Sequence, residues 1–579
     1  MKRRDFIQKL SMATLPFTLG GIPMRAMAEN ALTRLASQGT NDKVLVILQM
    51  HGGNDGLNAV IPITDYNLYY SKRPNIAIPL KNSARKMIKL DATLPPDAQV
   101  GLHPDMIGIK DLYDRGRMAI IQGVSYKNNN GSHFRGRDIS FMGGNFDEYK
   151  SSGWIGRYLG KYVDEKFSPN KYPDNFPIKG VMDDPLAIEM GNDVSLIFHQ
   201  DMNIPASISI GDETPKEFDE LVNGGLKGFE EEKGIDPFGF PPDLLKDSPY
   251  GKEIIWILGL EEKTKNYAAR LAKVFADGKE TTITYPENYP FNAPKGSLKN
   301  GLTRQLKTIA QLLAGGVQTK VFMVSIGGFD THANQVESYD PTMGNHAALM
   351  YHISSAMQAF QNDLKSRGGL EDRVLTVTTS EFGRRIESNG SYGTDHGTGA
   401  PMYVFGKGVK PGVFGKVPDL TKDNVDLQYD YRQVYSSILR DWMGVAENVV
   451  INDVFFGRDF FNGQRQDDPA KNYDNLTVAS EVITGTQDNF ISNRFGLIDC
   501  FPNPAKESTT ITFKMNNTNH VNLSLLDNTG STVKVLLNEQ KEEGEHSVTV
   551  TVTDLPSGIY FYKLKTGFVN ETKKMIVTH

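Results

Sequence analysis

Four short apolar segments, each running into a polar loop that contains glycine, constrain the fold more than any other feature of this sequence. They are Val44–Leu48, Met118–Ile121, Val321–Ser325 and Val374–Val377. Their apolar, β-branched composition predicts buried strands, and helical patterns such as His103–Gly116 lie between them. In an open α/β sheet, ligands bind outside the carboxyl ends of the strands. We therefore expect an α/β domain whose loops converge on one site.

The loops carry residue types that bind metal ions or transfer protons. The acidic and histidine candidates that follow the first, third and fourth strands are Asp55, Asp330, His332, Glu381, Asp395 and His396. Carboxylates and neutral imidazoles are ligands for zinc and similar metals. The pattern therefore predicts a metal site or an acid/base site. A structural interpretation stays open, because Asp55 also fits an Asn-Asp-Gly turn and Asp330 with His332 also fits a turn with an exposed histidine.

The loop after the second strand contains Ser132, His133 and Arg135. A hydroxyl beside a histidine, with an arginine close by, suits a nucleophile or an oxyanion-binding group. The preceding Asn-Asn-Asn-Gly run is also a turn signal, so a purely structural loop is the alternative.

Length and charge limit the classes of protein that fit. The chain has 579 residues, of which 39% are hydrophobic, so more than one domain is expected. Its formal net charge of -6 gives no support for nucleic-acid binding. The single cysteine, Cys500, excludes an intramolecular disulfide and a cysteine-rich metal site.

The two ends of the chain differ from the α/β region. Residues 1–28 combine Arg3-Arg4, a short apolar run and Ala26-Met27-Ala28, which predicts an export signal peptide. We expect the α/β domain over 29–462, a polar linker over 463–493 and a small all-β sandwich over 494–579, because short strands alternate with turn signals there. The apolar run of the signal is too short and too interrupted to span a bilayer, and no later segment is expected to be transmembrane.

The ordered motifs HGGNDGLN, GLHP, SHFRGRDI, GWIGRYLG, GGFDTH, TTSEFGR and GTDHGTG cover nearly all of residues 29 to about 462. This region resembles domain-of-unknown-function family 1501, which is related to the alkaline phosphatase and sulfatase superfamily. The resemblance implies a doubly wound, mostly parallel sheet of the alkaline phosphatase-like type. Members of the family are exported largely by the twin-arginine route, and Arg3-Arg4 resembles such a signal.

The C-terminal part resembles the sorting domain of the type IX secretion system. The resembling pieces are Phe501–Ala505, Leu555–Tyr560 and Lys573–Val577. This implies export to the cell surface or release, with the periplasm as an intermediate, and contact with the secretion machinery.

The superfamily resemblance also suggests roles for single residues. Asp55 resembles a first-strand metal ligand, Ser132 stands where a nucleophile is expected, and Asp330 with His332 resembles a pair that binds one metal. Glu381 and His396 resemble later ligands, and Asp395 either ligates or orients His396. The chain departs from the superfamily at Phe382, which replaces a histidine ligand, in the one-residue spacing of the Asp330–His332 pair, and in having no cysteine for conversion to formylglycine.

These observations predict a metal-dependent hydrolase of phosphate or sulfate esters. One or two zinc, manganese or calcium ions would polarise the ester, His133 would assist Ser132, and Arg135 or Arg384 would offset charge. The substrate would be a small molecule or a glycan ester. Two alternatives stay open: a surface binding protein with a degenerate site, and a structural envelope component.

Overall fold

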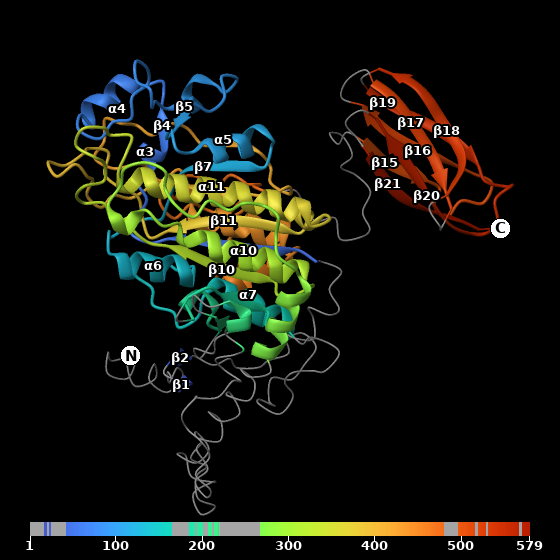
Figure 1. Ribbon diagram of the computed structural model, residues 1–579, viewed down its shortest axis with the longest axis horizontal. Helices are drawn as coiled ribbons and strands as arrows, with labels where there is room; N and C mark the ends of the chain where they lie inside the picture. Colours follow the sequence, from blue (N-terminus) through green and yellow to red (C-terminus); the bar gives the residue numbers. More distant parts are fainter. Residues whose placement is uncertain are drawn as a thin grey trace, which may run out of the picture. The chain divides into compact units, whose positions relative to one another are not determined.

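The computed structural model describes residues 42–164, 184–191, 194–200, 207–210, 214–217, 219, 267–479 and, with short gaps, 496–578, together with the backbone of 17–19 and 22–24. The chain divides into two compact units, Met1–Thr484 and Gly485–His579 (Figure 1). Among the described residues, no helix combines the length and the apolar character needed to cross a membrane. The predicted signal peptide at 1–28 and most of the region 169–242 lie outside the described residues, apart from two short paired strands, β1 (Phe17–Leu19) and β2 (Ile22–Met24).

A nine-stranded sheet forms the centre of the first unit. Its strands are β3 (Val44–Met50), β7 (Met118–Ser125), β8 (Ala187–Glu189), β9 (Ile208–Ser209), β10 (Val321–Ile326), β11 (Val374–Ser380), β12 (Ala400–Phe405), β13 (Gly412–Phe414) and β14 (Tyr429–Asp430). The strand order is β13-β7-β12-β11-β3-β10-β8-β9, and β14 pairs with β7. In this sheet only β12 pairs antiparallel with its neighbours. The predicted α/β class is confirmed, and the sheet is mixed.

Helices cover both faces of the sheet. Val44, Val46 and Leu48 of β3 pack into one apolar core, while Leu45 and Ile47 pack into the other. This alternation follows from the two-residue period of a strand, which turns successive side chains to opposite faces. Both faces of the sheet are therefore buried, which explains why the strands have continuous apolar sequences.

The first core is covered by α5 (Ile107–Asp114), α10 (Gly301–Ala314) and α11 (Asn345–Ser366). The second is covered by α6 (His133–Met142), α7 (Trp154–Asp164), α12 (Tyr431–Ser437) and the π-helical turns Ile438–Trp442 and Val450–Val454, which flank α13 (Glu447–Val449). Residues 267–277 are also helical. His346 and His352 lie buried in α11.

Smaller elements complete the first unit. A three-stranded sheet of β4 (Val60–Pro62), β6 (Val100–Leu102) and β5 (Ile88–Lys89) lies beside α3 (Gly56–Ala59) and α4 (Tyr66–Lys72). Single 3-10 turns occupy Pro96–Ala98, Leu196–Phe198, Lys295–Ser297 and Leu370–Asp372. Residues 463–479, predicted as the start of a linker, pack instead into the second core through Tyr473, Leu476 and Val478. Together with Ala479, these apolar residues anchor an otherwise polar segment.

The second unit is all-β, as predicted. One sheet contains β15 (Gly496–Phe501), β16 (Ser508–Met515) and β19 (Gly544–Thr551), and the other contains β18 (Thr532–Lys541), β17 (Asn519–Leu526), β20 (Gly558–Lys565) and β21 (Asn570–Val577). Residues of both sheets form one apolar core, which includes the buried side chain of Cys500.

Candidate functional site

The carboxyl ends of the central strands bring the predicted loops to one edge of the sheet. Strands β10 and β11 flank β3 and run parallel to it, and both Ile326 and Ser380 are in register with Met50. The three loops therefore begin at the same level. Strand β7 reaches the same edge, because both β7 and β11 are antiparallel to β12, which lies between them.

Three side chains from three of these loops meet at one point, which we call the His/Asp/His cluster. It consists of His133, Asp330 and His396, whose ligand atoms all lie within 4.8 Å of one another. His133 Nε2 is 3.4 Å from Asp330 Oδ2, and His396 Nε2 is 3.4 Å from Asp330 Oδ1. His133 is the first residue of α6, and the other two follow β10 and β11.

The hydrogen bond of His396 fixes its tautomer. Its Nδ1 lies 2.7 Å from the carbonyl oxygen of Gly131, which only accepts, so Nδ1 carries the proton. Burial lowers the pKa of His396 and favours the neutral ring, which leaves a lone pair on Nε2. That lone pair is turned toward the Asp330 carboxylate, and His133 Nε2 has no hydrogen-bond partner among the described residues. Electron-rich atoms at such distances are stabilised by a cation between them, so the donor set fits a divalent metal.

Arg384 holds the Asp330 carboxylate in place. The buried guanidinium donates to Asp330 Oδ1 at 2.7 Å, to Gly53 O at 2.9 Å and to Thr394 O at 3.1 Å. Burial alone would raise the pKa of Asp330, but the hydrogen bond and charge of Arg384 outweigh it and the pKa lies below its usual value. Arg384 thus ties three loops together and keeps Asp330 ionised.

His332 and Asp395 form a second layer beside the cluster. His332 Nε2 lies 3.3 Å from Asp330 Oδ1, and its Nδ1 lies 3.4 Å from Asp395 Oδ1. Asn389 donates to Asp395 Oδ1 at 3.1 Å, and this hydrogen bond is the main cause of the lowered pKa of Asp395. Asp395 therefore orients His332 rather than His396, whose Nδ1 is held by Gly131.

Phe382 closes the apolar side of the cluster. Its ring is 3% exposed and lies 4.9 Å from the His133 ring and 4.5 Å from the His396 ring, measured between centroids. An aromatic ring at this position packs against both imidazoles and limits their rotation. It provides no ligand for a second metal.

Asp55 is placed in a buried ion pair, away from the His/Asp/His cluster. Its two carboxylate oxygens accept from Arg73 Nη1 at 2.8 and 2.7 Å, and Gln335 Nε2 donates to Oδ2 at 2.6 Å. Burial would raise the pKa of Asp55, but the charge of Arg73 and these hydrogen bonds lower it. Arg73 also donates to the carbonyls of Arg385 and Ile386, so the pair joins the first and fourth loops.

Replacing Arg73 by methionine is expected to destabilise the first unit by about 3–5 kcal/mol, because it leaves the Asp55 carboxylate buried without a partner. All three tryptophans lie in this unit, so urea unfolding followed by tryptophan fluorescence reports on it alone. The lowered pKa of Asp55 in the wild type contributes stability above the unfolded value of about 3.9 that is lost as the pH falls through the folded value.

The matched control is the double variant Arg73→Met with Asp55→Asn, which removes both charges and is expected to recover much of the loss. The defect of the single variant should also shrink between pH 7 and pH 4, as the unpaired carboxyl takes up a proton. A single variant as stable as the wild type at pH 7 would contradict the assignment.

Glu381 is held by the backbone of the first loop. Its Oε2 accepts from the N–H groups of Gly52 and Gly53 at 2.8 and 2.9 Å, and its Oε1 lies 3.7 Å from His51 Nδ1. Burial would raise the pKa of Glu381, but these contacts lower it. Both glycines have positive φ, and a Cβ on Gly52 would lie 2.2 Å from Asp330 N, so this anion-binding turn requires glycine.

The loop after β7 gives Ser132 a structural role that the sequence analysis did not predict. Ser132 is the N-cap of α6, and its Oγ accepts from Arg135 N at 3.4 Å. The hydroxyl is exposed. Its neighbours in the chain are Gly131, which contacts His396 of the cluster, and His133, which belongs to the cluster. The guanidinium of Arg135 turns away, because it donates to the Phe146 and Glu148 carbonyls and lies over the Tyr149 ring.

Two known protein families match parts of this chain. Residues 287–460 match the family described as "Protein of unknown function (DUF1501)", and residues 499–578 match the family described as "Secretion system C-terminal sorting domain". The first match lies in the first unit and the second match lies in the second unit. The DUF1501 match includes Asp330 and His396 and ends before the second unit begins.

The search of curated proteins gave no match. Seven chains of solved structures match, and one of them is the crystal structure of the Ig1 domain of mouse SynCAM 2. It is 17% identical, covers 12% of this chain and 81% of that chain, and has a TM-score of 0.10. At this TM-score the similarity supports no conclusion on the fold.

The sorting domain establishes that the protein is exported, to the cell surface or into the medium. We expect a chain that ends at Thr484 to be retained inside the cell envelope, because it has lost the sorting domain. This chain keeps the whole described α/β sheet and all three tryptophans, so tryptophan fluorescence can report whether its first unit is folded. Surface labelling with a membrane-impermeant reagent checks this. A truncated chain that is labelled like the full-length protein would contradict it.

Proposed function

We propose that the first unit is a metal-dependent hydrolase of phosphate or sulfate esters. The observation that carries the proposal is the convergence of His133, Asp330 and His396, with two imidazole nitrogens directed at one carboxylate. Three protein ligands of this kind leave a position for substrate, as catalytic metal sites require.

The donor set favours some cations over others. Two imidazoles and one carboxylate suit zinc or manganese, whereas calcium and magnesium prefer oxygen ligands alone. Because Asp55 and Glu381 are engaged by Arg73 and by the Gly52–Gly53 backbone, we infer one ion rather than two. Such an ion would supply Lewis-acid polarisation of an ester oxygen.

The chain's own residues would supply the rest of the chemistry. Ser132 has an exposed hydroxyl at the amino end of α6, where the helix dipole favours developing negative charge, and we assign it as the nucleophile. His332, oriented by Asp395, lies on the open side of Asp330 and is suited to move a proton to or from the substrate. Arg135 and Arg384 are bound to backbone carbonyls and serve to position the loops.

Two finer assignments belong to this proposal. The mostly parallel sheet with ligand-bearing loops at its carboxyl edge supports an alkaline phosphatase-like fold. Arg3-Arg4 supports a twin-arginine signal, which would deliver the first unit to the periplasm already folded.

The direct test is hydrolysis of p-nitrophenyl phosphate and p-nitrophenyl sulfate by the mature protein. We expect turnover of at least one ester, its loss after treatment with a chelator, and its recovery with zinc or manganese. Failure of metal-loaded protein to hydrolyse a panel of phosphate and sulfate esters would contradict the proposal.

A surface binding protein is the second candidate. The observation that favours it is Phe382, which occupies the side of the cluster where a further ligand would stand and leaves a reduced site. This candidate predicts that an ester or its product anion binds to the protein without turnover.

A further inference from the structure

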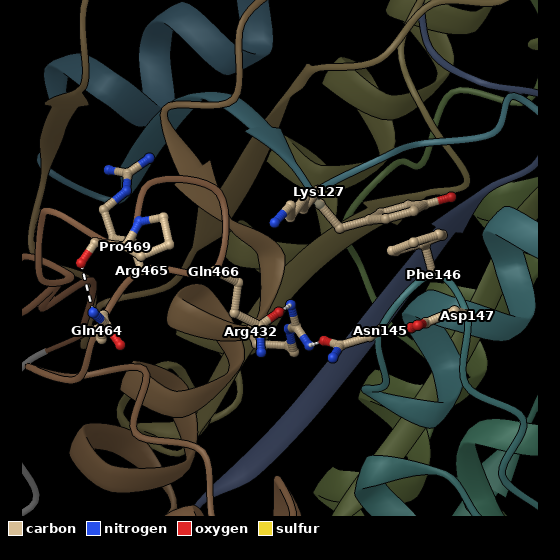
Figure 2. Close-up of a pocket in the computed structure, with 10 residues that line it drawn as sticks. Lys127, Asn145, Phe146, Asp147, Arg432, Gln464, Arg465, Gln466 and Pro469 are labelled. Carbon is tan, nitrogen blue, oxygen red and sulfur yellow. Dashed lines mark hydrogen bonds between the residues drawn. The ribbon is translucent and has the colours of Figure 1, made fainter.

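A cavity of about 330 Å³ opens beside the loop that follows β7. We call it the amide pocket. Its walls come from residues 126–127, 145–147, 464–466 and 469, together with Arg432 of α12. Figure 2 shows Gln464, Arg465 and Pro469 on one side and Phe146 and Asp147 on the other, with Lys127 reaching in between. The volume is at the lower end of the range for small-molecule sites.

Buried charges fix the orientation of the amides in this pocket. Arg432 is 1% exposed and forms a two-bond ion pair with Asp430, at 2.8 and 2.7 Å. It also donates to Asn145 Oδ1 at 2.7 Å and to Gln466 Oε1 at 2.9 Å (Figure 2). Because the oxygens of both amides face Arg432, their NH₂ groups are the atoms that remain as donors for a ligand.

Two other side chains that line the pocket, those of Gln464 and Asp147, offer acceptors. Gln464 Nε2 donates to the carbonyl of Pro469 at 2.5 Å, so its Oε1 remains to accept (Figure 2). Asp147 adds a carboxylate and Lys127 adds an ammonium group. The pocket therefore presents both donors and acceptors, which hydroxyl groups require, since each hydroxyl both donates and accepts.

The charges of the pocket nearly cancel. Arg432 is neutralised by Asp430, and Arg465 is neutralised by Asp467 through bonds of 3.0 and 2.7 Å. Lys127 and Asp147 have opposite signs. An anionic ligand would find no uncompensated cluster of cations here, so the site favours a neutral one.

An aromatic surface completes the pocket. Phe146 and Tyr126 line it, and Phe146 is 36% exposed. A pyranose matches this lining, because it can pack a C–H face on a ring while its hydroxyls bond to amides. We propose that the amide pocket binds a neutral saccharide of one or two sugar units. The site needs no metal and does not depend on the hydrolase proposal.

Saturation-transfer NMR on the full chain tests this assignment. The probes are glucose, galactose, mannose, N-acetylglucosamine and their β-linked disaccharides, with glucuronic acid and glucose 6-sulfate as anionic counterparts. We expect saturation of at least one neutral sugar. Affinity should fall about 50-fold or more in the double variant Gln464→Ala, Asp147→Ala, which removes one neutral and one charged hydrogen-bonding group.

The matched control is Gln318→Ala, an exposed glutamine that precedes the amino end of β10 at the opposite edge of the sheet. It is expected to bind sugar as the wild type does. Both Gln464 and Asp147 are exposed, so the double variant should keep the wild-type fluorescence spectrum. The proposal is overturned if no neutral sugar binds, if the double variant binds as tightly as the wild type, or if the anionic sugars bind more tightly than the neutral ones.

Discussion

Mature protein with Asp330 replaced by asparagine is expected to lose its metal, while the wild type carries about one zinc or manganese ion per chain. The carboxylate of Asp330 faces both His133 and His396, so its loss removes the one negative ligand of the cluster. Since loss of outer partners alone costs about 10–100-fold in metal affinity, loss of Asp330 should cost more than that. Elemental mass spectrometry on dialysed protein measures the content directly.

Two further variants calibrate this result. Asp395→Asn should keep the wild-type metal content, since Asp395 contacts His332, which is not one of the three proposed ligands. Asp372→Asn changes an exposed aspartate before the amino end of β11 and should keep full occupancy. Wild-type protein that stays metal-free after incubation with excess zinc and manganese would contradict the hydrolase proposal. The binding-protein candidate would then be favoured.

Replacing Ser132 by asparagine is expected to lower ester hydrolysis by about 1,000-fold or more, as loss of a nucleophile does. Asparagine caps a helix as well as serine, so the N-cap of α6 is retained and only the hydroxyl is lost. Metal content should stay at the wild-type level, because Ser132 is outside the cluster. Steady-state kinetics on the best ester, beside elemental analysis, measures both.

Ser132→Ala separates the two roles of this residue. It removes the hydroxyl and the cap together, so it should be as inactive as Ser132→Asn and less stable by about 1 kcal/mol. If Ser132→Asn retains wild-type activity and Ser132→Ala loses only stability, Ser132 is a cap alone and water is the nucleophile.

The central strands were predictable because both of their faces are buried. Val321–Ser325 lies within β10, and Val374–Val377 lies within β11. The strands continue beyond these apolar runs, and the reason is local: in β11, Thr378 Oγ1 accepts from Tyr403 N at 2.9 Å and Thr379 Oγ1 lies 3.0 Å from the Tyr435 hydroxyl. Polar side chains with such partners continue a buried strand, and a sequence does not reveal the partners.

One rule about strand ends was enough to predict that the loops converge. That rule did not predict which of their side chains form pairs. Arg73 follows α4 and gave no signal that it would reach Asp55. Arg384, directly after the Glu-Phe-Gly of the fourth loop, gave a weak signal that it would pair with a carboxylate, since a buried arginine at a strand end needs one. Gly131, which fixes the His396 tautomer, acts through its carbonyl, and a backbone group leaves no mark in sequence.

The position of β3 has a consequence for how the chain reaches its native state. This strand comes first in the sheet along the sequence, yet its two neighbours are β10 and β11, and the bond from Gly52 to Glu381 joins residues 329 positions apart. During synthesis or threading, this fully buried strand therefore stays unpaired until more than half of the polypeptide has emerged. Such long-range pairing makes folding slow and leaves an aggregation-prone intermediate. We expect this protein to need a chaperone on whichever side of the membrane it folds.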